Sequence, residues 1–300
     1  MVIFLPQKCG TRGGGCVRGD KVWSERVVPG EPEIFVAWQQ GVGDRTLLAI
    51  HGGPDWDHSY LRDPLEQLDC RLLMPDLRGC GRSGRVPEEE YHPDGVMRDL
   101  VRVLDEFGVE RADVLGHSYG GMVAQRFAIT HPSRVRSLIV SGSSVLPVPP
   151  DAFAGWTERD EILARQEDPW QREDLSPEEC VRAEAFAAVQ ANIWRPEAIP
   201  GYLRRLEDVR FGAEWARPFL AGTLVSPRLP DAAQRIAELG IPVLLLHGKQ
   251  DMTFPVSLVE PTLKLIPHAR AAVLEEAGHM AHVDEPDGYV GAVREFLASS

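Results

Sequence analysis

The chain has 300 residues, of which 32 are basic and 45 acidic, so its formal net charge is −13. This length suffices for one large or two small domains, and a composition of 43% hydrophobic and 26% charged residues is typical of a soluble globular protein. The negative charge argues against nucleic acid or an anionic membrane as a partner, and no apolar run reaches the roughly 18 residues of a spanning helix. We expect a cytoplasmic protein. The oligomeric state is not predicted.

The cysteines and the N-terminal segment show no targeting or metal-binding pattern. Five cysteines are scattered along the chain: Cys9, Cys16, Cys70, Cys80 and Cys180. None forms a CxxC pair, which excludes zinc-ribbon and dithiol redox motifs and favours reduced thiols in the cytoplasm. Residues 1–20 contain a short apolar run followed by a glycine-rich stretch. The apolar run is too short for a secretory signal. We expect them to form a disordered leader.

Short apolar segments alternate with amphipathic ones along most of the chain. This alternation predicts an α/β fold with a mostly parallel sheet covered by helices on both faces. Strands are expected at residues 33–39, 46–50, 71–75, 112–115, 135–140, 242–246 and 271–274. Helices are expected at residues 93–107, 119–130, 257–266 and 287–297. In the first helix Val96, Leu100 and Val103 recur at a spacing of 3–4 residues, and Gly108 ends it.

The alternation stops between residues 142 and 240, where the sequence is rich in Glu, Arg and Ala. Four of the seven tryptophans lie in this stretch: Trp156, Trp170, Trp194 and Trp215. A helical insertion between two strands belongs over the carboxyl ends of the strands, where such folds bind ligands. We therefore predict a helical cap at residues 142–240 over a core formed by residues 21–141 and 241–300. The predicted substrate pocket is lined by Trp56, Trp156, Trp194 and Trp215; alternatively, the cap tryptophans only hold the cap together.

The segment Gly116-His117-Ser118-Tyr119-Gly120 matches the pattern G-x-S-x-G. It lies between a predicted strand and a predicted helix, the context in which this pattern forms a nucleophile elbow. Glycines are needed because the sharp turn brings the backbones of the strand and the helix close together. We predict that Ser118 is a nucleophile; the alternative is an ordinary helix-capping serine.

A serine hydroxyl needs a base to remove its proton. His279 follows the predicted strand at 271–274 and precedes the last helix, so it lies at the carboxyl edge of the sheet. His282 is the nearest rival. Three other histidines, His51, His117 and His247, stand at strand ends, and we expect them to bond to the backbone. We predict His279 as the base.

The histidine in turn needs a carboxylate to orient it. Asp251 follows the strand at 242–246 and gives the chain order Ser, Asp, His, which is typical of folds with a nucleophile elbow. The other usual place for the acid follows the strand at 135–140 and contains no carboxylate. Asp76 also follows a strand, but its Gly- and Arg-rich surroundings favour loop stabilisation. We therefore predict Asp251 as the acid.

Acyl transfer also needs two donors for the tetrahedral oxyanion. One is expected to be the backbone N–H of Tyr119, directly after the nucleophile. The other is expected in the loop His51-Gly52-Gly53-Pro54. Since Pro54 has no N–H, Gly53 is the first candidate and Asp55 the second.

The motifs HGGP, DLRGCGRS, GHSYGG, HGKQD and AGHMAHVDEP, in this order, resemble the α/β-hydrolase superfamily from about residue 30 onward. The run HGGP, DHSYL and RGCGRS is similar to the proline iminopeptidase-related branch. The resemblance implies Ser118 as nucleophile, Asp251 and His279 as its partners, and Gly53 and Tyr119 as oxyanion donors. It also implies a helical cap after the sixth strand and neither metal nor organic cofactor.

Two positions depart from that branch. Asp55 stands where glycine is usual after HGGP, and the elbow reads GHSYG in place of GGSWG. An aminopeptidase must also bind a free amino group with carboxylates. The candidate cap acids for that role are Glu158, Glu161, Glu184, Glu207 and Glu214.

These patterns predict a serine hydrolase that cleaves a small carboxylic ester, lactone or amide through an acyl-enzyme. A proline iminopeptidase is the close alternative. Serine at position 118 excludes dehalogenases and epoxide hydrolases, which use aspartate there. A cofactor-free lyase or oxygenase and a non-catalytic binding protein remain as more distant alternatives, since a fold does not determine a substrate.

Overall fold

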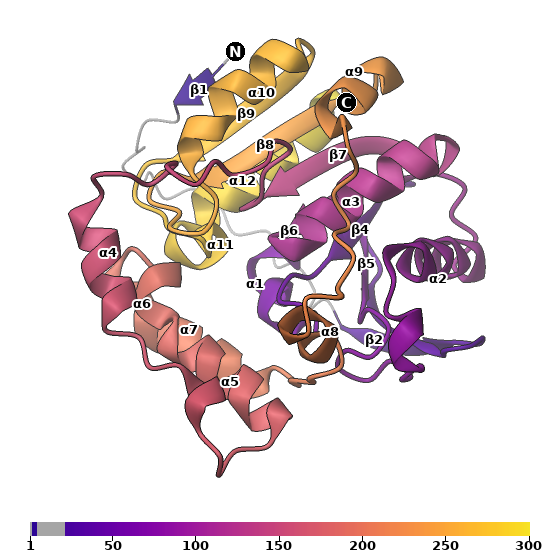
Figure 1. Ribbon diagram of the computed structural model, residues 1–300. Helices are drawn as coiled ribbons and strands as arrows, with labels where there is room; N and C mark the ends of the chain where they lie inside the picture. Colours follow the sequence, from indigo (N-terminus) through magenta and orange to yellow (C-terminus); the bar gives the residue numbers. More distant parts are fainter. Residues whose placement is uncertain (1, 5–21) are drawn as a thin grey trace.

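The computed structural model describes residues 2–4 and 22–300 (Figure 1). Its strands form one sheet in the order β1-β9-β8-β7-β6-β4-β5-β3-β2. They are β1 (Val2–Phe4), β2 (Ser24–Val28), β3 (Ile34–Gln39), β4 (Thr46–Ile50), β5 (Arg71–Pro75), β6 (Ala112–His117), β7 (Val135–Ser141), β8 (Val243–Gly248) and β9 (Ala269–Leu274). Among these described strands, the pairs β2–β3 and β3–β5 are antiparallel and the other pairs are parallel. The predicted mostly parallel sheet is therefore confirmed.

The central strands are buried on both faces. In β4, Leu48 and Ile50 pack into the core on one side of the sheet, and Leu47 and Ala49 pack into the core on the other. Successive side chains of a strand point to opposite faces, so a strand covered on both sides must be apolar throughout. This explains why the buried strands are continuous apolar runs.

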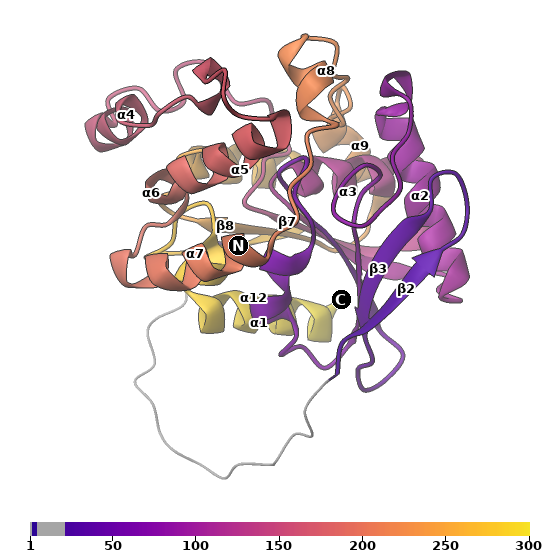
Figure 2. The same cartoon turned by 90° about the horizontal axis from the view of Figure 1, so that it is seen from below.

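Helices cover both faces of the sheet, as Figure 2 shows. One face carries α2 (Pro93–Glu106), α3 (Tyr119–Thr130), α9 (Ala232–Leu239) and α10 (Val259–Leu265). The other carries α1 (Arg62–Leu65), α11 (Ala281–Asp284) and α12 (Pro286–Ser299). These helices enclose the two apolar cores, and the loops that follow β4, β6, β8 and β9 are left to form a site at the carboxyl edge of the sheet.

An insertion of helices lies between β7 and α9. It contains α4 (Thr157–Ala164), α5 (Pro177–Ala187), α6 (Val189–Asn192), α7 (Ile199–Asp208) and α8 (Ala216–Leu220). In both views α8 stands apart from the group α4–α7 (Figures 1 and 2). The insertion follows the sixth strand when β1 is left out of the count.

The predicted end of the cap at residue 240 lies too far along the chain. Helix α9 falls inside the predicted cap, yet Ala232, Ala233 and Ile236 are buried in the core beside the sheet, and α9 packs against α3. The apolar stripe that made α9 resemble a cap helix is the face it presents to the core.

The N-terminal prediction is only partly covered by the structure. Residues 2–4, inside the expected leader, form β1 and pair in parallel with β9; residues 1 and 5–20 lie outside the described residues. So do Cys9 and Cys16, whereas Cys70, Cys80 and Cys180 are buried. Within the described ranges, no helix combines the length and the hydropathy that crossing a membrane requires.

Candidate active site

Ser118 occupies a sharp turn between β6 and α3. Its backbone angles, φ 56° and ψ −120°, lie in a region that non-glycine residues rarely adopt. A Cβ on Gly116 would lie 2.0 Å from the carbonyl oxygen of Gly120, and a Cβ on Gly120 would lie 2.3 Å from that of His51. Both glycines are therefore required by the close approach of the turn, the helix and the neighbouring loop.

The structure brings Ser118, His279 and Asp251 into one hydrogen-bonded line. His279 Nε2 lies 3.0 Å from Ser118 Oγ, and His279 Nδ1 lies 3.0 Å from Asp251 Oδ2. Asp251 Oδ1 accepts the N–H groups of Thr253 and Phe254, each at 2.8 Å. With its Nδ1–H donated to the carboxylate, the imidazole has Nε2 free to accept the serine proton.

The carboxyl group of Asp251 is held in its charged form. Burial is the largest single influence and opposes this charge, but the partners of the carboxylate, His279 foremost through its charge and hydrogen bond, together lower the pKa of Asp251 to about 2. The nearby His247 and the Phe254 N–H act in the same direction. An acid that stays ionised at neutral pH can keep His279 in one tautomer throughout a reaction.

A second chain of hydrogen bonds connects the loop after β4 to the backbone of His279. The N–H of Gly52 donates to Tyr60 Oη (2.8 Å), Tyr60 Oη lies 3.0 Å from His117 Nδ1, and His117 Nε2 lies 3.2 Å from the carbonyl oxygen of His279. A carbonyl only accepts, so Nε2 of His117 carries the proton and Nδ1 accepts from the tyrosine. Burial lowers the pKa of His117 to about 3 and keeps the ring neutral.

The other histidines at strand ends contact backbone carbonyl groups, as the sequence predicts. His51 Nδ1 lies 2.8 Å from the carbonyl oxygen of Gly52, and His247 Nε2 lies 2.7 Å from that of Phe254. The rival His282 packs its ring against Tyr60, His117 and Tyr289, and burial lowers its pKa well below the ordinary value. It is His279 that contacts Ser118.

Of the two predicted oxyanion donors, Tyr119 directly follows Ser118 in the chain and Gly53 borders the same cavity. Tyr119 is the first residue of α3, so its N–H is one of those that a helix leaves without an intrahelical acceptor. Gly53 lines the same cavity as Ser118 and has a φ of 106°. A Cβ at Gly53 would lie 2.6 Å from the Trp56 ring, which is a second reason for glycine there.

Asp55, whose backbone N–H is the second oxyanion candidate, also holds the start of α8. Its carboxylate accepts the N–H groups of Trp215 (2.9 Å) and Ala216 (2.7 Å), where α8 begins, and its carbonyl accepts the N–H of Gly212 (2.8 Å). Burial raises the pKa of this carboxyl group to about 6. The residue that replaces the usual glycine thus fastens the cap to the loop that contains Gly53.

A cavity of about 510 Å³ opens above Ser118 and His279 and is walled by the core and by α5 and α8. Of the four tryptophans predicted to line it, Trp56 does so. The prediction is wrong for Trp156, Trp194 and Trp215, which do not border the cavity. Trp170, which we left unassigned, lines it.

These three tryptophans pack within the cap or join it to the core. Trp215 is fully buried, donates its indole N–H to the carbonyl of Arg78 (2.8 Å) and packs against Tyr91 and Tyr119. The backbone N–H of Trp194 donates to Asp284 (3.0 Å), and Trp156 packs beside Phe153.

The cap acids differ in whether they border the cavity. Of the five candidates, only Glu184 lines the cavity, and its carboxylate accepts the indole N–H of Trp170 at 3.2 Å. Glu214 is paired with Arg85 at 2.7 Å. The other three, Glu158, Glu161 and Glu207, do not border the cavity.

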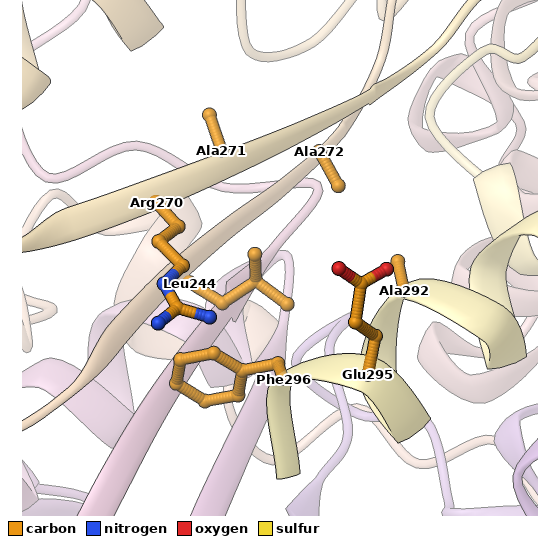
Figure 3. Close-up of a pocket in the computed structure, with 7 residues that line it drawn as sticks. All are labelled: Leu244, Arg270, Ala271, Ala272, Ala292, Glu295 and Phe296. Atoms are coloured by element: carbon orange, nitrogen blue, oxygen red, sulfur yellow. The ribbon is translucent and has the colours of Figure 1, made fainter. Parts of the chain in front are cut away.

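A much smaller hollow, about 30 Å³, lies between α12 and the first half of β8 and β9 (Figure 3). It is bordered by Leu244, Arg270 and Phe296 among others. It has room for little more than water and is lined by none of the predicted site residues.

Among the residues that the structure describes, one buried group has metal-ligating side chains: Asp57, His58 and Asp76. Its donor atoms are occupied by the protein itself. His58 Nδ1 lies 2.6 Å from Asp76 Oδ1, the other oxygen of Asp76 accepts the N–H of Arg82, and His58 Nε2 faces the Arg62 guanidinium at 2.8 Å. A guanidinium at that nitrogen does not fit a cation site, and the group stabilises the loops after β4 and β5, as we expected for Asp76.

In a comparison with known protein families, the sequence model of the alpha/beta hydrolase fold family matches residues 45–286 of the chain. The chain belongs to the α/β-hydrolase family. This hydrolase is 27% identical over 271 residues to the 2-hydroxymuconate semialdehyde hydrolase of a Pseudomonas species, covering 85% of this chain and 87% of that protein. It is 28% identical over 276 residues to the proline iminopeptidase of Saccharolobus solfataricus, covering 85% of each.

Among solved structures, the α/β-hydrolase is similar to the proline iminopeptidase-related protein of Thermus thermophilus. The TM-score is 0.70, the identity is 25%, and the match covers 93% of this chain and 98% of the other. The predicted resemblance to the superfamily is therefore confirmed, with proline iminopeptidases among the relatives.

Proposed function

We propose that this α/β-hydrolase is a serine hydrolase that cleaves a small carboxylic ester, lactone or amide through an acyl-enzyme. The observation that carries the proposal is the line of contacts from Ser118 Oγ through His279 to Asp251, at the floor of a cavity. A hydroxyl, an imidazole and a buried carboxylate in this order are what nucleophilic acyl transfer requires.

In the proposed reaction, Ser118 Oγ attacks the substrate carbonyl while His279 Nε2 takes the serine proton. Asp251 keeps the imidazole oriented and stabilises its positive charge. The N–H groups of Gly53 and Tyr119 receive the oxyanion, and each such donor is typically worth about 2.7–4 kcal/mol. His279 then protonates the leaving group and afterwards activates the water that releases the acid.

Release of N-terminal proline is the second candidate, because the chain is similar to proline iminopeptidases and one cap carboxylate, Glu184, borders the cavity. We place the ester first, since Glu184 is the only one of the five cap acids at the cavity and already accepts a hydrogen bond from Trp170. A buried amine would need fuller compensation of its charge.

A substrate panel tests this proposal. We would compare kcat/KM for p-nitrophenyl acyl esters, acyl lactones and proline β-naphthylamide, in the wild type and in Ser118→Ala. We expect ester or lactone turnover, lost at least about 100-fold in the variant with an unchanged melting temperature. Clear preference for the proline substrate would favour the second candidate. Turnover that survives Ser118→Ala would contradict both, and no turnover of any substrate would favour a lyase, an oxygenase or a binding protein.

A further inference from the structure

Two cap helices turn mainly apolar faces toward the cavity, and Glu184 is the one charged residue of α5 that lines it. Along α5 and its C-terminal end, Val181, Ala185 and Ala188 line the cavity, at the spacing of one helix face. From α8, Ala216, Phe219 and Leu220 line it. The cavity therefore continues from Ser118 into an apolar space bordered by α5 and α8.

The α8 wall extends from the cavity to the solvent. Phe219 is 67% exposed and Leu220 54% exposed, although both line the cavity. The other large apolar side chains that are exposed in the described part of the chain, such as Leu265, do not line it. Single exposed apolar residues are ordinary, but a neighbouring pair at the mouth of a site offers apolar surface to a ligand.

The charges around the cavity are all of one sign. Within the described part of the chain, no lysine or arginine lines it, whereas Asp55 and Glu184 do. Both oxygens of Asp55 accept backbone N–H groups, so Glu184 is the acid whose carboxylate can meet a ligand. A substrate carboxylate would leave water without gaining a cation and would be repelled by Glu184.

Building on the proposed function, we propose that the site selects uncharged esters with an apolar chain. The chain lies between α5 and α8 with its end on Phe219 and Leu220, and Glu184 disfavours substrates that carry a carboxylate. This assigns substrate selection to the cap, in residues separate from Ser118, His279 and Asp251.

Chain length tests the apolar part. We would measure kcat/KM for p-nitrophenyl esters from acetate to octanoate, and for alkyl acetates from ethyl to octyl. In one of the two series the value should rise with length, up to about fourfold for each methylene that becomes buried. In the double variant Phe219→Ser, Leu220→Ser, the ratio of the longest to the shortest substrate should fall about tenfold.

Leu265→Ser is the matched control, since Leu265 is 52% exposed on α10 and does not border the cavity. We expect it to behave as the wild type in both series. If neither series rises with length, or if the α8 variant keeps the wild-type ratio, the apolar part of the proposal is wrong.

A pair of substrates tests the charge part. p-Nitrophenyl butyrate and the p-nitrophenyl monoester of succinate differ mainly by a terminal carboxylate. We expect the butyrate to be preferred at least about tenfold, and Glu184→Gln to reduce that preference severalfold, more so at low salt. Glu158→Gln, a cap acid away from the cavity, should leave the preference unchanged. Equal turnover of the two substrates by the wild type would contradict the charge part.

These results are separable from the proposed function. Ester turnover that depends on Ser118 but shows neither preference would overturn this inference alone. Ester turnover that persists in Ser118→Ala would overturn the proposed function, whatever the preferences.

Discussion

At the scale of single residues, Tyr60 and His117 matter because they connect two parts of the site that are far apart in the chain. Tyr60 accepts the N–H of Gly52, beside the proposed oxyanion donor, and His117 reaches the carbonyl of His279. All these groups are buried, so a missing hydroxyl cannot be replaced cheaply by water. We infer that Tyr60 is a positioning residue.

The change Tyr60→Phe tests this inference. It leaves the Gly52 N–H and His117 Nδ1 without the hydroxyl, so the loop and His279 lose a shared anchor. We expect kcat for p-nitrophenyl butyrate to fall at least about tenfold with a smaller change in KM. Tyr289→Phe is the control, because Tyr289 is equally buried and its hydroxyl contacts Ser141 at 2.8 Å. Equal losses of kcat in the two variants would show that Tyr60 acts only through stability.

The elbow glycines give a second prediction. Gly120→Ala would place a Cβ 2.3 Å from the carbonyl oxygen of His51, and backbone has to shift to relieve that contact. We expect the free energy of unfolding to fall by about 2 kcal/mol or more, as measured by urea titration. Gly291→Ala is the control: in α12 a Cβ meets nothing within 4 Å, so a gain of up to about 1 kcal/mol is expected. Equal stability of the two variants would contradict the steric explanation.

Single residues also show where sequence reasoning reaches its limit. Ser118, His279 and Asp251 stand at motif positions that the chain order defines, so they could be named from the sequence. Tryptophans in a helical insertion carry no such mark. Trp170 lines the cavity and Trp215 is fully buried because of how the cap packs on the core, and that packing depends on contacts between distant segments.

At the scale of elements, Asp55 joins α8 to the loop after β4. Its folded pKa of about 6 lies above the ordinary value of 3.8 because burial opposes its charge. Between these two pH values the unfolded chain has lost a proton that the folded protein retains. Raising the pH through this window therefore favours the unfolded state.

We predict that this effect is visible in Asp55→Asn. Between pH 4 and pH 7 the wild type should lose about 2–3 kcal/mol of unfolding free energy relative to the variant. Urea titrations at several pH values provide the measurement. A difference between the two proteins that stays constant with pH would show that Asp55 does not titrate in this window.

Elements with one strong signal were predicted well, and those with a mixed signal were not. The expected strands at residues 46–50 and 71–75 coincide with β4 and β5, because both are continuous apolar runs. Strand β2 was missed, since three of its five residues are exposed and it lies at the sheet edge. Helix α9 was assigned to the cap because its apolar face does not tell which neighbour it contacts.

At the scale of the whole molecule, the sheet order places the site. Ser118 follows β6, Asp251 follows β8 and His279 follows β9, and these parallel strands lie within one half of the sheet. Their carboxyl ends therefore share one edge, which is where such folds bind ligands. The position of α5 and α8 above that edge depends on cap packing, which the motifs do not encode.

The proposed chemistry uses only side chains and backbone groups of this chain. The one described group with metal-ligating side chains consists of Asp57, His58 and Asp76. Its donor atoms are engaged in hydrogen bonds within the protein, including one between His58 and Arg62. We therefore predict that exhaustive dialysis against EDTA leaves kcat/KM for p-nitrophenyl butyrate unchanged. Activity that is lost on dialysis and restored by a divalent cation would contradict this prediction.

The most direct test of the proton relay is covalent labelling with a fluorophosphonate, followed by peptide mass spectrometry. We predict one phosphonyl group per chain, bound at Ser118, with labelling at least about 100-fold slower in His279→Ala. A label on any other residue, or an equal rate in the two proteins, would contradict the relay from Ser118 through His279 to Asp251.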